Sequence, residues 1–350
     1  MRGQGTLLGA LAIFVVACGG GSGGETSGTG GTGSSSTASG TGGAGTSTTA
    51  SGTGGGVGGT GGAPGEPRFV AVGYGGRRLS STDGIAWTHD IVVDPNGGDD
   101  DNLFRGVGYA DGVFIAVGGS SKGQNATSPD GAGWTFGPPG TAWLADVVPL
   151  NGALVTAGGN GLRQRSLDGG VTWVDATGYY AGHYRAIAAG NGMAVAAGHT
   201  YGDTHVGLTS TTTDGKTWTP EVTGGVAFHS IAFGNGVFVA AGDTRCSTST
   251  DGQAWKDCAG VSGSGFDGVV FANDRFILGD GAGYWLSTDG ASWQHQDGEH
   301  HGVAAYGEGL YVALDWPDRI STSPDLKTWT VRQEKTGPAL VQVAYGLVKP

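Results

Sequence analysis

Several carboxylates in the chain occur where general acid and base groups could act together. Asp243, Asp280 and Asp315 each follow a short apolar segment, and Asp267 opens another such segment. In glycoside hydrolases, two carboxyl groups about 5–10 Å apart act as acid and as nucleophile or base. If neighbouring structural units bring two of these four side chains together, the chain could hydrolyse a glycosidic bond.

Basic side chains open segments of the same kind. The segments "FRGVGYA", "YRAIAAG", "FHSIAFG", "FDGVVFA" and "HGVAAYG" each carry a polar residue at or near their start. These residues are Arg105, Arg185, His229, Asp267 and His301. With nearby aromatic residues, including Tyr284 and Trp316, they could hold a peptide or a sugar. The alternative is that the arginines and aspartates pair with one another and cap loops.

Two acidic or histidine-rich stretches raise the question of a metal ion. The stretch "DPNGGDDDN" contains Asp99–Asp101, and such oxygen-rich runs can bind Ca²⁺. Its spacing is not that of an EF-hand loop, and a solvated acidic loop is the alternative. The stretch "HQDGEHH" (residues 295–301) has no fixed ligand spacing. We therefore predict no resident cofactor, with calcium at Asp99–Asp101 as the alternative.

These segments belong to a unit that also contains a repeated turn, in which Ser or Thr, one residue, Asp and usually Gly precede a Trp. We call it the aspartate turn. Its aspartates are Asp83, Asp130, Asp168, Asp214, Asp251, Asp289 and Asp325, and its tryptophans are Trp87, Trp134, Trp173, Trp218, Trp255, Trp293 and Trp329. Asp accepts hydrogen bonds from turn amides, Gly tolerates positive φ, and the indole can be buried. The turn is thus predicted to be structural.

The spacing of the turns predicts the fold. Successive aspartates are 47, 38, 46, 37, 38 and 36 residues apart, and a period near forty is typical of propeller blades. Asn-Gly between apolar runs, as in "AIAAGNGMAVAAG", is a hairpin signal. We predict an all-β, seven-bladed β-propeller of four-stranded antiparallel blades. The segment "PRFVAVG" lacks an opening strand and "ALVQVAYGLVKP" supplies one, so the C-terminal strand is predicted to complete the first blade.

The repeat resembles the Asp-box, or bacterial neuraminidase repeat. Proteins with this repeat include sialidases, sortilin-type receptors, xyloglucan-cleaving propellers and photosystem II assembly factors. The resemblance covers residues 68–350 and implies that the turns lie away from the binding face. No sialidase motif surrounds Arg105 or Arg185, so the hydrolytic activity of sialidases does not carry over. Leu326 replaces the turn Gly, and Pro129 and Pro324 precede two aspartates, so these copies are predicted to be the least regular.

The N-terminal residues predict export. Residues 1–18 combine Arg2 with an apolar run too short to span a bilayer, and "VVAC" resembles the bacterial lipobox, which implies a lipid on Cys18. The alternative is an ordinary secretory signal. Gly19 implies the outer membrane by the rule for such lipoproteins. Residues 19–66 are almost wholly Gly, Ser, Thr and Ala, and predict a disordered tether that spans roughly 35–40 Å. The propeller is assigned to residues 67–350.

Cys246 and Cys258 flank one aspartate turn symmetrically. If that turn joins two antiparallel strands, the two residues are near neighbours across the strands, and an exported protein favours oxidation. We predict a disulfide; two buried thiols are the alternative.

The composition narrows the class of partner. Lys and Arg total 18, the formal charge is −12, and no basic patch is visible, so nucleic acid is not expected. We predict a monomeric, lipid-anchored envelope protein whose propeller binds a protein or a glycan on its loop face. The alternatives are a glycoside hydrolase that uses carboxylates at the channel mouth and a scaffold for envelope assembly.

Overall fold

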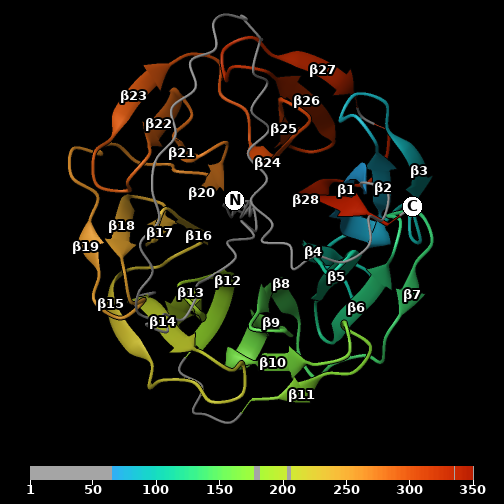
Figure 1. Cartoon of the computed structure of the whole chain (residues 1–350), viewed down its shortest axis with the longest axis horizontal. Helices are drawn as coiled ribbons and strands as arrows, with labels where there is room; N and C mark the ends of the chain where they lie inside the picture. Colours follow the sequence, from blue (N-terminus) through green and yellow to red (C-terminus); the bar gives the residue numbers. More distant parts are fainter. Residues whose placement is uncertain (1–64, 177–181, 203–205, 335, 350) are drawn as a thin grey trace, which may run out of the picture. The chain divides into compact units, whose positions relative to one another are not determined.

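Seven four-stranded antiparallel sheets form a closed ring in the computed structural model (Figure 1). The structure describes residues 65–176, 182–202, 206–334 and 336–349. The predicted all-β class, the seven blades and the four strands of each blade are confirmed. Cys18 and the tether up to residue 64 lie outside the described residues, so lipidation and domain boundaries there stay predictions. Within the described residues, no helix is long and apolar enough to cross a membrane.

We number the blades in chain order after the one that contains both ends of the ring. Blade 1 comprises β4 (Phe104–Ala110), β5 (Val113–Gly119), β6 (Gly123–Ser128) and β7 (Thr135–Phe136). Blade 2 comprises β8 (Leu144–Leu150), β9 (Ala153–Gly158), β10 (Arg163–Ser166) and β11 (Val174–Asp175), with the 3-10 turn η2 (Gly159–Gly161). Blade 3 comprises β12 (Gly182–Gly190), β13 (Met193–Thr200), β14 (Val206–Thr212) and β15 (Val222–Val226).

The remaining blades follow the same order. Blade 4 comprises β16 (Ser230–Gly234), β17 (Val237–Gly242), β18 (Arg245–Ser249) and β19 (Lys256–Asp257). Blade 5 comprises β20 (Gly268–Ala272), β21 (Arg275–Gly279), β22 (Gly283–Ser287) and β23 (Gln294–Asp297). Blade 6 comprises β24 (Val303–Gly307), β25 (Leu310–Asp315), β26 (Arg319–Ser323) and β27 (Thr330–Gln333). The closing blade comprises β28 (Leu340–Val348), β1 (Glu66–Gly73), β2 (Arg78–Ser81) and β3 (Thr88–Ile91), with the 3-10 turn η1 (Tyr74–Gly76).

The closing blade joins the two ends of the ring. β28 pairs antiparallel with β1, with Tyr345 opposite Phe69 and Ala344 opposite Val70. Phe69 and Val70 are fully buried. Because β1 would otherwise be an unpaired apolar edge, the C-terminal strand removes an edge that would invite association with other chains. The predicted closure by the C-terminal strand is confirmed.

The innermost strand of each blade lies nearest the ring axis and packs on the innermost strands of its neighbours (Figure 1). Several contacts are too close for a side chain larger than hydrogen. A Cβ on Gly234 would lie 2.0 Å from the ring of Phe271 in the next blade, and one on Gly346 would lie 2.4 Å from Tyr109. These glycines therefore let aromatic rings of one blade pack directly on the backbone of another.

The aspartate turns are built as their sequence predicts. In the turn of blade 4, Oδ1 of Asp251 accepts the amides of Gln253 and Ala254, both at 2.9 Å. The hydroxyl of Ser249 accepts the amide of Gly252 at 2.9 Å, and the indole of Trp255 donates to the carbonyl of Gly252 at 3.1 Å. This turn thus satisfies its own backbone groups and fixes its tryptophan against the sheet.

The least regular turn is neither of the two, at Asp130 and Asp325, that the sequence indicates. Asp130 accepts the amides of Ala132 and Gly133 at 2.8 and 2.9 Å, as a regular turn requires. Leu326 adopts φ 63°, close to the φ 68° of Gly252, and Asp325 still accepts the two following amides. The turn differs in that the indole nitrogen of Trp329 has no hydrogen-bond partner among the described residues. The turn at Asp168 departs most, because its extra residue makes Oδ1 accept the amide of Thr172 at 2.9 Å.

A disulfide joins the two outer strands of blade 4. Cys246 and Cys258 are bonded, with their Cα atoms 5.3 Å apart. The amide of Cys258 also donates to the carbonyl of Cys246 at 2.9 Å. Strands β18 and β19 are therefore held together by a covalent link as well as by their ladder.

Candidate functional site

The loops between the second and third strands and the links between blades share one end of the ring, which we call the loop face. The aspartate turns occupy the opposite end. Arg105 lies on β4 and Arg185 on β12, while His229 and Asp267 immediately precede β16 and β20. All four stand where an innermost strand enters from the loop face. The structure thus brings these predicted residues to one face, although it distributes them over four blades.

An indole lies between the two arginines. The guanidinium carbon of Arg105 is 5.0 Å from the ring centroid of Trp143, and that of Arg185 is 5.3 Å from it. Trp143 immediately precedes β8, the innermost strand of the blade between them. Cation–π contacts of this kind hold guanidinium groups in place without neutralising their charge. Arg105, Trp143 and Arg185 therefore form a cationic cluster across blades 1 to 3.

The two arginines differ in their partners. Arg105 forms an ion pair with Asp99 and donates from Nε to the carbonyl of Gly119 at 2.8 Å. Arg185 donates from Nε to the His199 ring at 3.1 Å, and no carboxylate of the described residues forms an ion pair with it. Burial lowers the pKa of Arg185, and the charge of Arg105 lowers it further. An additional negative charge at this point would therefore be stabilised.

Aromatic side chains extend the cluster toward solvent. The ring of His183 stacks on Trp143 with centroids 5.8 Å apart and is nearly perpendicular to the ring of Tyr201, with centroids 4.9 Å apart. Tyr201 is 47% exposed. In the closing blade and blade 6, Trp316 is 64% exposed, and Tyr74 lies edge-on to it at 5.7 Å. The loop face thus offers two exposed aromatic surfaces in addition to the arginines.

Each of the four predicted carboxylates faces a histidine. The nitrogen-to-oxygen distances are 2.9 Å for His229 and Asp243, 2.8 Å for His300 and Asp267, 2.9 Å for His295 and Asp280, and 2.7 Å for His301 and Asp315. Burial alone would raise the pKa of Asp315, but the His301 ring and the Ser321 hydroxyl hold it below its usual value. The carboxylates are therefore engaged in local pairs rather than directed at one another.

Two predicted residues are buried instead of lining the rim. His301 is 4% exposed and stacks on Trp329 with ring centroids 4.4 Å apart. Gly302 takes the position that corresponds to Arg105 and Arg185, because each of the three lies six residues before the turn that follows its strand, whereas His301 lies seven residues before it. Tyr284 is 1% exposed, and its hydroxyl accepts the amide of His301 at 2.8 Å. Neither ring is available to a ligand.

The acidic loop uses its carboxylates separately. Asp99 pairs with Arg105, whereas Asp101 accepts the amides of Ser121 and Lys122 at 2.7 and 2.9 Å. The amide of Lys122 and the hydroxyl of Ser121 lower the pKa of Asp101 to about 2. Within the described residues no group of three His, Cys, Asp or Glu side chains is placed to hold a metal ion. Calcium at Asp99–Asp101 stays a prediction.

Sequence reasoning did not find Trp143, although one signal points to it. Trp143 precedes β8 as His183 precedes Tyr184 on β12, so both rings enter the loop face at equivalent places. The pairing of histidines with the carboxylates was also missed, although His229 and His301 were among the candidates, because each pair joins residues 14 to 33 positions apart whose proximity depends on strand register.

Fold and site together define a seven-bladed β-propeller with a cationic and aromatic loop face. No protein-family model matches the chain, and no curated protein matches it. Solved propellers do resemble it. A structure of YCF48 bound to D1 peptide superposes with a TM-score of 0.52 at 17% identity, over 71% of this chain and 85% of that one. The WD40 β-propeller domain of Doa1 superposes with a TM-score of 0.51 at 13% identity, over 71% and 84%. These likenesses concern the fold.

Proposed function

We propose that the loop face binds an extended segment of a partner protein through a carboxylate of that segment. The observation that carries this proposal is Arg185, a partly buried guanidinium stacked on Trp143 beside a second arginine, with no ion-pair partner among the described residues. A planar guanidinium binds a carboxylate through two parallel hydrogen bonds. Because Trp143 shields one side of the group from water, such a pair would be stronger than an exposed one.

The surroundings favour a peptide over a small ion. Tyr201 contacts the His183 ring that stacks on Trp143, so it can cover an apolar side chain near the bound carboxylate, while Trp316 of blade 6 offers a second exposed aromatic surface farther along the same face. The similar YCF48 propeller is described as bound to D1 peptide. A glycan remains the second ligand class for this face, since exposed aromatic rings also stack on sugars. Each of the four predicted carboxylates pairs with a histidine and not with a second carboxylate, which favours binding over glycoside hydrolysis.

We also propose where the propeller acts. The lipobox-like "VVAC" and the tether that follows it support a lipoprotein anchored at Cys18 in the outer membrane. The repeated aspartate turns support membership of the Asp-box propellers. In that setting the protein would hold an envelope partner near the membrane, and a scaffold without a defined ligand is the alternative.

The test is binding by the chain expressed without residues 1–18. An array of synthetic peptides, with and without a free C-terminal carboxylate and with graded numbers of Asp and Glu, is screened beside a glycan array. Peptides that bind are then titrated by calorimetry against the wild-type protein, Arg185→Gln and Arg275→Gln. Arg275 is the matched control because it begins β21, at the end of the ring opposite the loop face.

We expect carboxylate-bearing peptides to bind and Arg185→Gln to weaken them at least tenfold, because the variant leaves the bound carboxylate without its charged partner. Arg275→Gln should leave the affinity unchanged. Binding to glycans alone would replace the peptide proposal, and equal affinities for the two variants would place the site elsewhere.

A further inference from the structure

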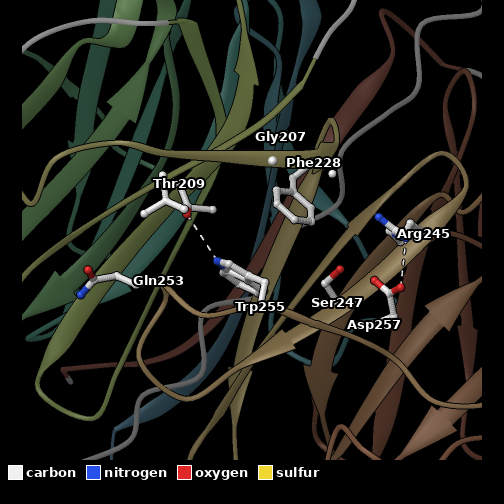
Figure 2. Close-up of a pocket in the computed structure, with 11 residues that line it drawn as sticks. Gly207, Thr209, Phe228, Arg245, Ser247, Gln253, Trp255 and Asp257 are labelled. Atoms are coloured by element: carbon white, nitrogen blue, oxygen red, sulfur yellow. Dashed lines mark hydrogen bonds and ion pairs between the residues drawn. The ribbon is translucent and has the colours of Figure 1, made fainter.

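A pocket lies between the outer strands of blades 3 and 4. It has a volume of about 270 Å³. β14 and β15 of blade 3 form one wall, and β18, β19 and the aspartate turn of blade 4 form the other. Figure 2 shows the indole of Trp255 reaching toward Thr209 across the boundary, with Phe228 beside it and the Arg245–Asp257 pair at one end.

Two features of this boundary leave space for the pocket. At two other boundaries, a large side chain of one blade covers the turn tryptophan of the next: Arg163 lies 5.3 Å from the Trp218 ring, and Tyr284 lies 6.4 Å from the Trp329 ring. The equivalent residue of blade 3 is the small Thr209, which reaches Trp255 only through a hydrogen bond of 3.3 Å. The Trp255 ring is therefore left partly uncovered.

Glycines in the outermost strand of blade 3 leave further space for the pocket. β15 carries Gly224 and Gly225 at a point where its register with β14 shifts. A Cβ on Gly224 would meet no atom within 4 Å, and one on Gly225 would meet only Arg245. Side chains at these two positions would narrow the opening, so the glycines keep the pocket accessible from solvent.

The chemistry of the lining fits an uncharged, polar ring. Trp255 and Phe228 stack with centroids 5.4 Å apart and present an aromatic surface. Arg245 and Asp257 neutralise each other at 3.0 Å, so the pocket offers a donor and an acceptor side by side without a net charge. Gln253 and Ser247 add further hydrogen-bonding groups. An adjacent donor and acceptor match two neighbouring hydroxyl groups, while an aromatic face matches the C–H face of a pyranose.

The disulfide makes this arrangement rigid. Cys246 follows Arg245 and Cys258 follows Asp257, so the covalent link joins the two strands immediately beside the ion pair. Binding therefore does not have to order the wall that carries both charged groups, which lowers the entropic cost of association.

We propose that this pocket is a site for one neutral hexose unit of a glycan, separate from the loop face. The volume accommodates a single pyranose ring but is below the range of drug-sized pockets. For a ligand of this size, we expect a dissociation constant on the order of 1 mM. The proposal does not depend on the peptide site, because no residue of the cationic cluster lines the pocket.

The probes are methyl β-D-glucopyranoside, methyl β-D-galactopyranoside and methyl α-D-mannopyranoside, measured by saturation-transfer difference NMR with the chain expressed without residues 1–18. We expect at least one glycoside to show transfer to its ring C–H protons. Trp255→Ala should reduce the affinity at least tenfold, and Arg245→Ala severalfold. Trp293→Ala is the matched control, because Trp293 makes the same contact with its turn glycine at 3.0 Å but lines no part of the pocket.

Arg245→Ala also keeps the test valid if Trp255→Ala does not fold, because the Arg245 side chain is 43% exposed. Absence of transfer from all three glycosides would overturn the proposal. So would binding that Arg245→Ala and Trp255→Ala leave unchanged. Stronger binding of N-acetyl-tyrosinamide than of any glycoside, lost in the same variants, would assign the pocket to a protein side chain instead.

Discussion

Asp146 is a carboxyl group with an unusual environment. It lies on β8 next to the ring axis and is fully buried. Its Oδ1 accepts the amide of Val147 at 2.8 Å, whereas Oδ2 has no hydrogen-bond partner. Burial raises the pKa of Asp146 to about 8, against the opposing hydrogen bonds from Val147 and Gln342. The side chain is therefore uncharged in the folded protein at neutral pH.

This group should make the protein less stable as the pH rises. Below about pH 4 the carboxyl is protonated in both the folded and the unfolded state. Between about pH 4 and 8 the unfolded chain loses the proton while the folded protein keeps it, so the free energy of unfolding falls. Above pH 8 both states are ionised and the loss levels off. The contribution is on the order of several kcal/mol.

Asp146→Asn tests this dependence because it makes the uncharged form permanent. We expect the variant to gain stability over the wild-type protein as the pH is raised from 4 to 8, in urea unfolding monitored by tryptophan fluorescence. Asp111→Asn is the control, because Asp111 is exposed in a turn where equivalent blades carry Asn. A difference between Asp146→Asn and wild type that is the same at pH 4 and pH 8 would contradict the assignment.

Among the elements, the aspartate turn at Asp325 shows that packing of a buried side chain can compensate for the absence of the usual turn glycine. A non-glycine residue at positive φ costs about 1–2 kcal/mol, which explains why the turn position is usually Gly. Leu326 nevertheless adopts φ 63°, and its side chain is 2% exposed in the cluster that contains Tyr311 and Val312. Burial of the leucine therefore offsets the backbone strain.

Leu326→Gly should accordingly destabilise the protein, although it relieves the strain. Removal of a buried leucine side chain costs about 2–5 kcal/mol and the strain amounts to about 1–2 kcal/mol, so the net loss is about 0–4 kcal/mol. The measurement is the urea midpoint of the variant. The reverse change, Gly252→Ala, should also destabilise, because the added Cβ would lie 2.5 Å from Val195. A higher midpoint for Leu326→Gly would show that the strain outweighs the packing.

The elements that could be predicted are those formed by residues close together in the sequence. Asp251 and Gly252 form their turn with groups a few residues away, and Asn191-Gly192 forms the hairpin between β12 and β13, so both were recognisable. The site depended on other blades. Trp143 belongs to the site because arginines of two neighbouring blades contact its ring. The pocket depends on the small size of Thr209 opposite Trp255. Neither of these contacts between blades produces a periodic pattern in the sequence.

At the scale of the whole molecule, a cluster of charged side chains around the buried Arg77 links blade 6 to the closing blade. Arg77, between η1 and β2, is fully buried and donates to Asp90 at 2.9 Å from Nε and to the carbonyl of Pro338 at 2.8 Å. It also pairs with Asp318, in the loop between β25 and β26. Asp318 accepts the amide of Gly337 at 2.7 Å, in the link that leads to β28.

The cluster ties Arg77 of the closing blade to blade 6 and to the link before β28, so its loss should weaken the closure of the ring and affect the entire propeller. Asp318→Ala would leave Arg77 buried with one carboxylate fewer and would free the amides of the link before β28. Removal of one member of a buried ion pair costs about 3–5 kcal/mol, whereas an exposed pair contributes about 0–1 kcal/mol. Asp257→Ala is the matched control, because Asp257 is 62% exposed in its pair with Arg245.

We expect Asp318→Ala to lower the urea midpoint strongly in a single transition, because all blades lose their support when the ring opens. Asp257→Ala should lower it slightly. Hydrogen exchange measured by mass spectrometry would locate the effect, with β1 and β28 exchanging first in the Asp318 variant. Equal midpoints for the two variants, or exchange that begins in another blade, would mean that the strand pairing of β1 with β28 closes the ring without help from the charged cluster.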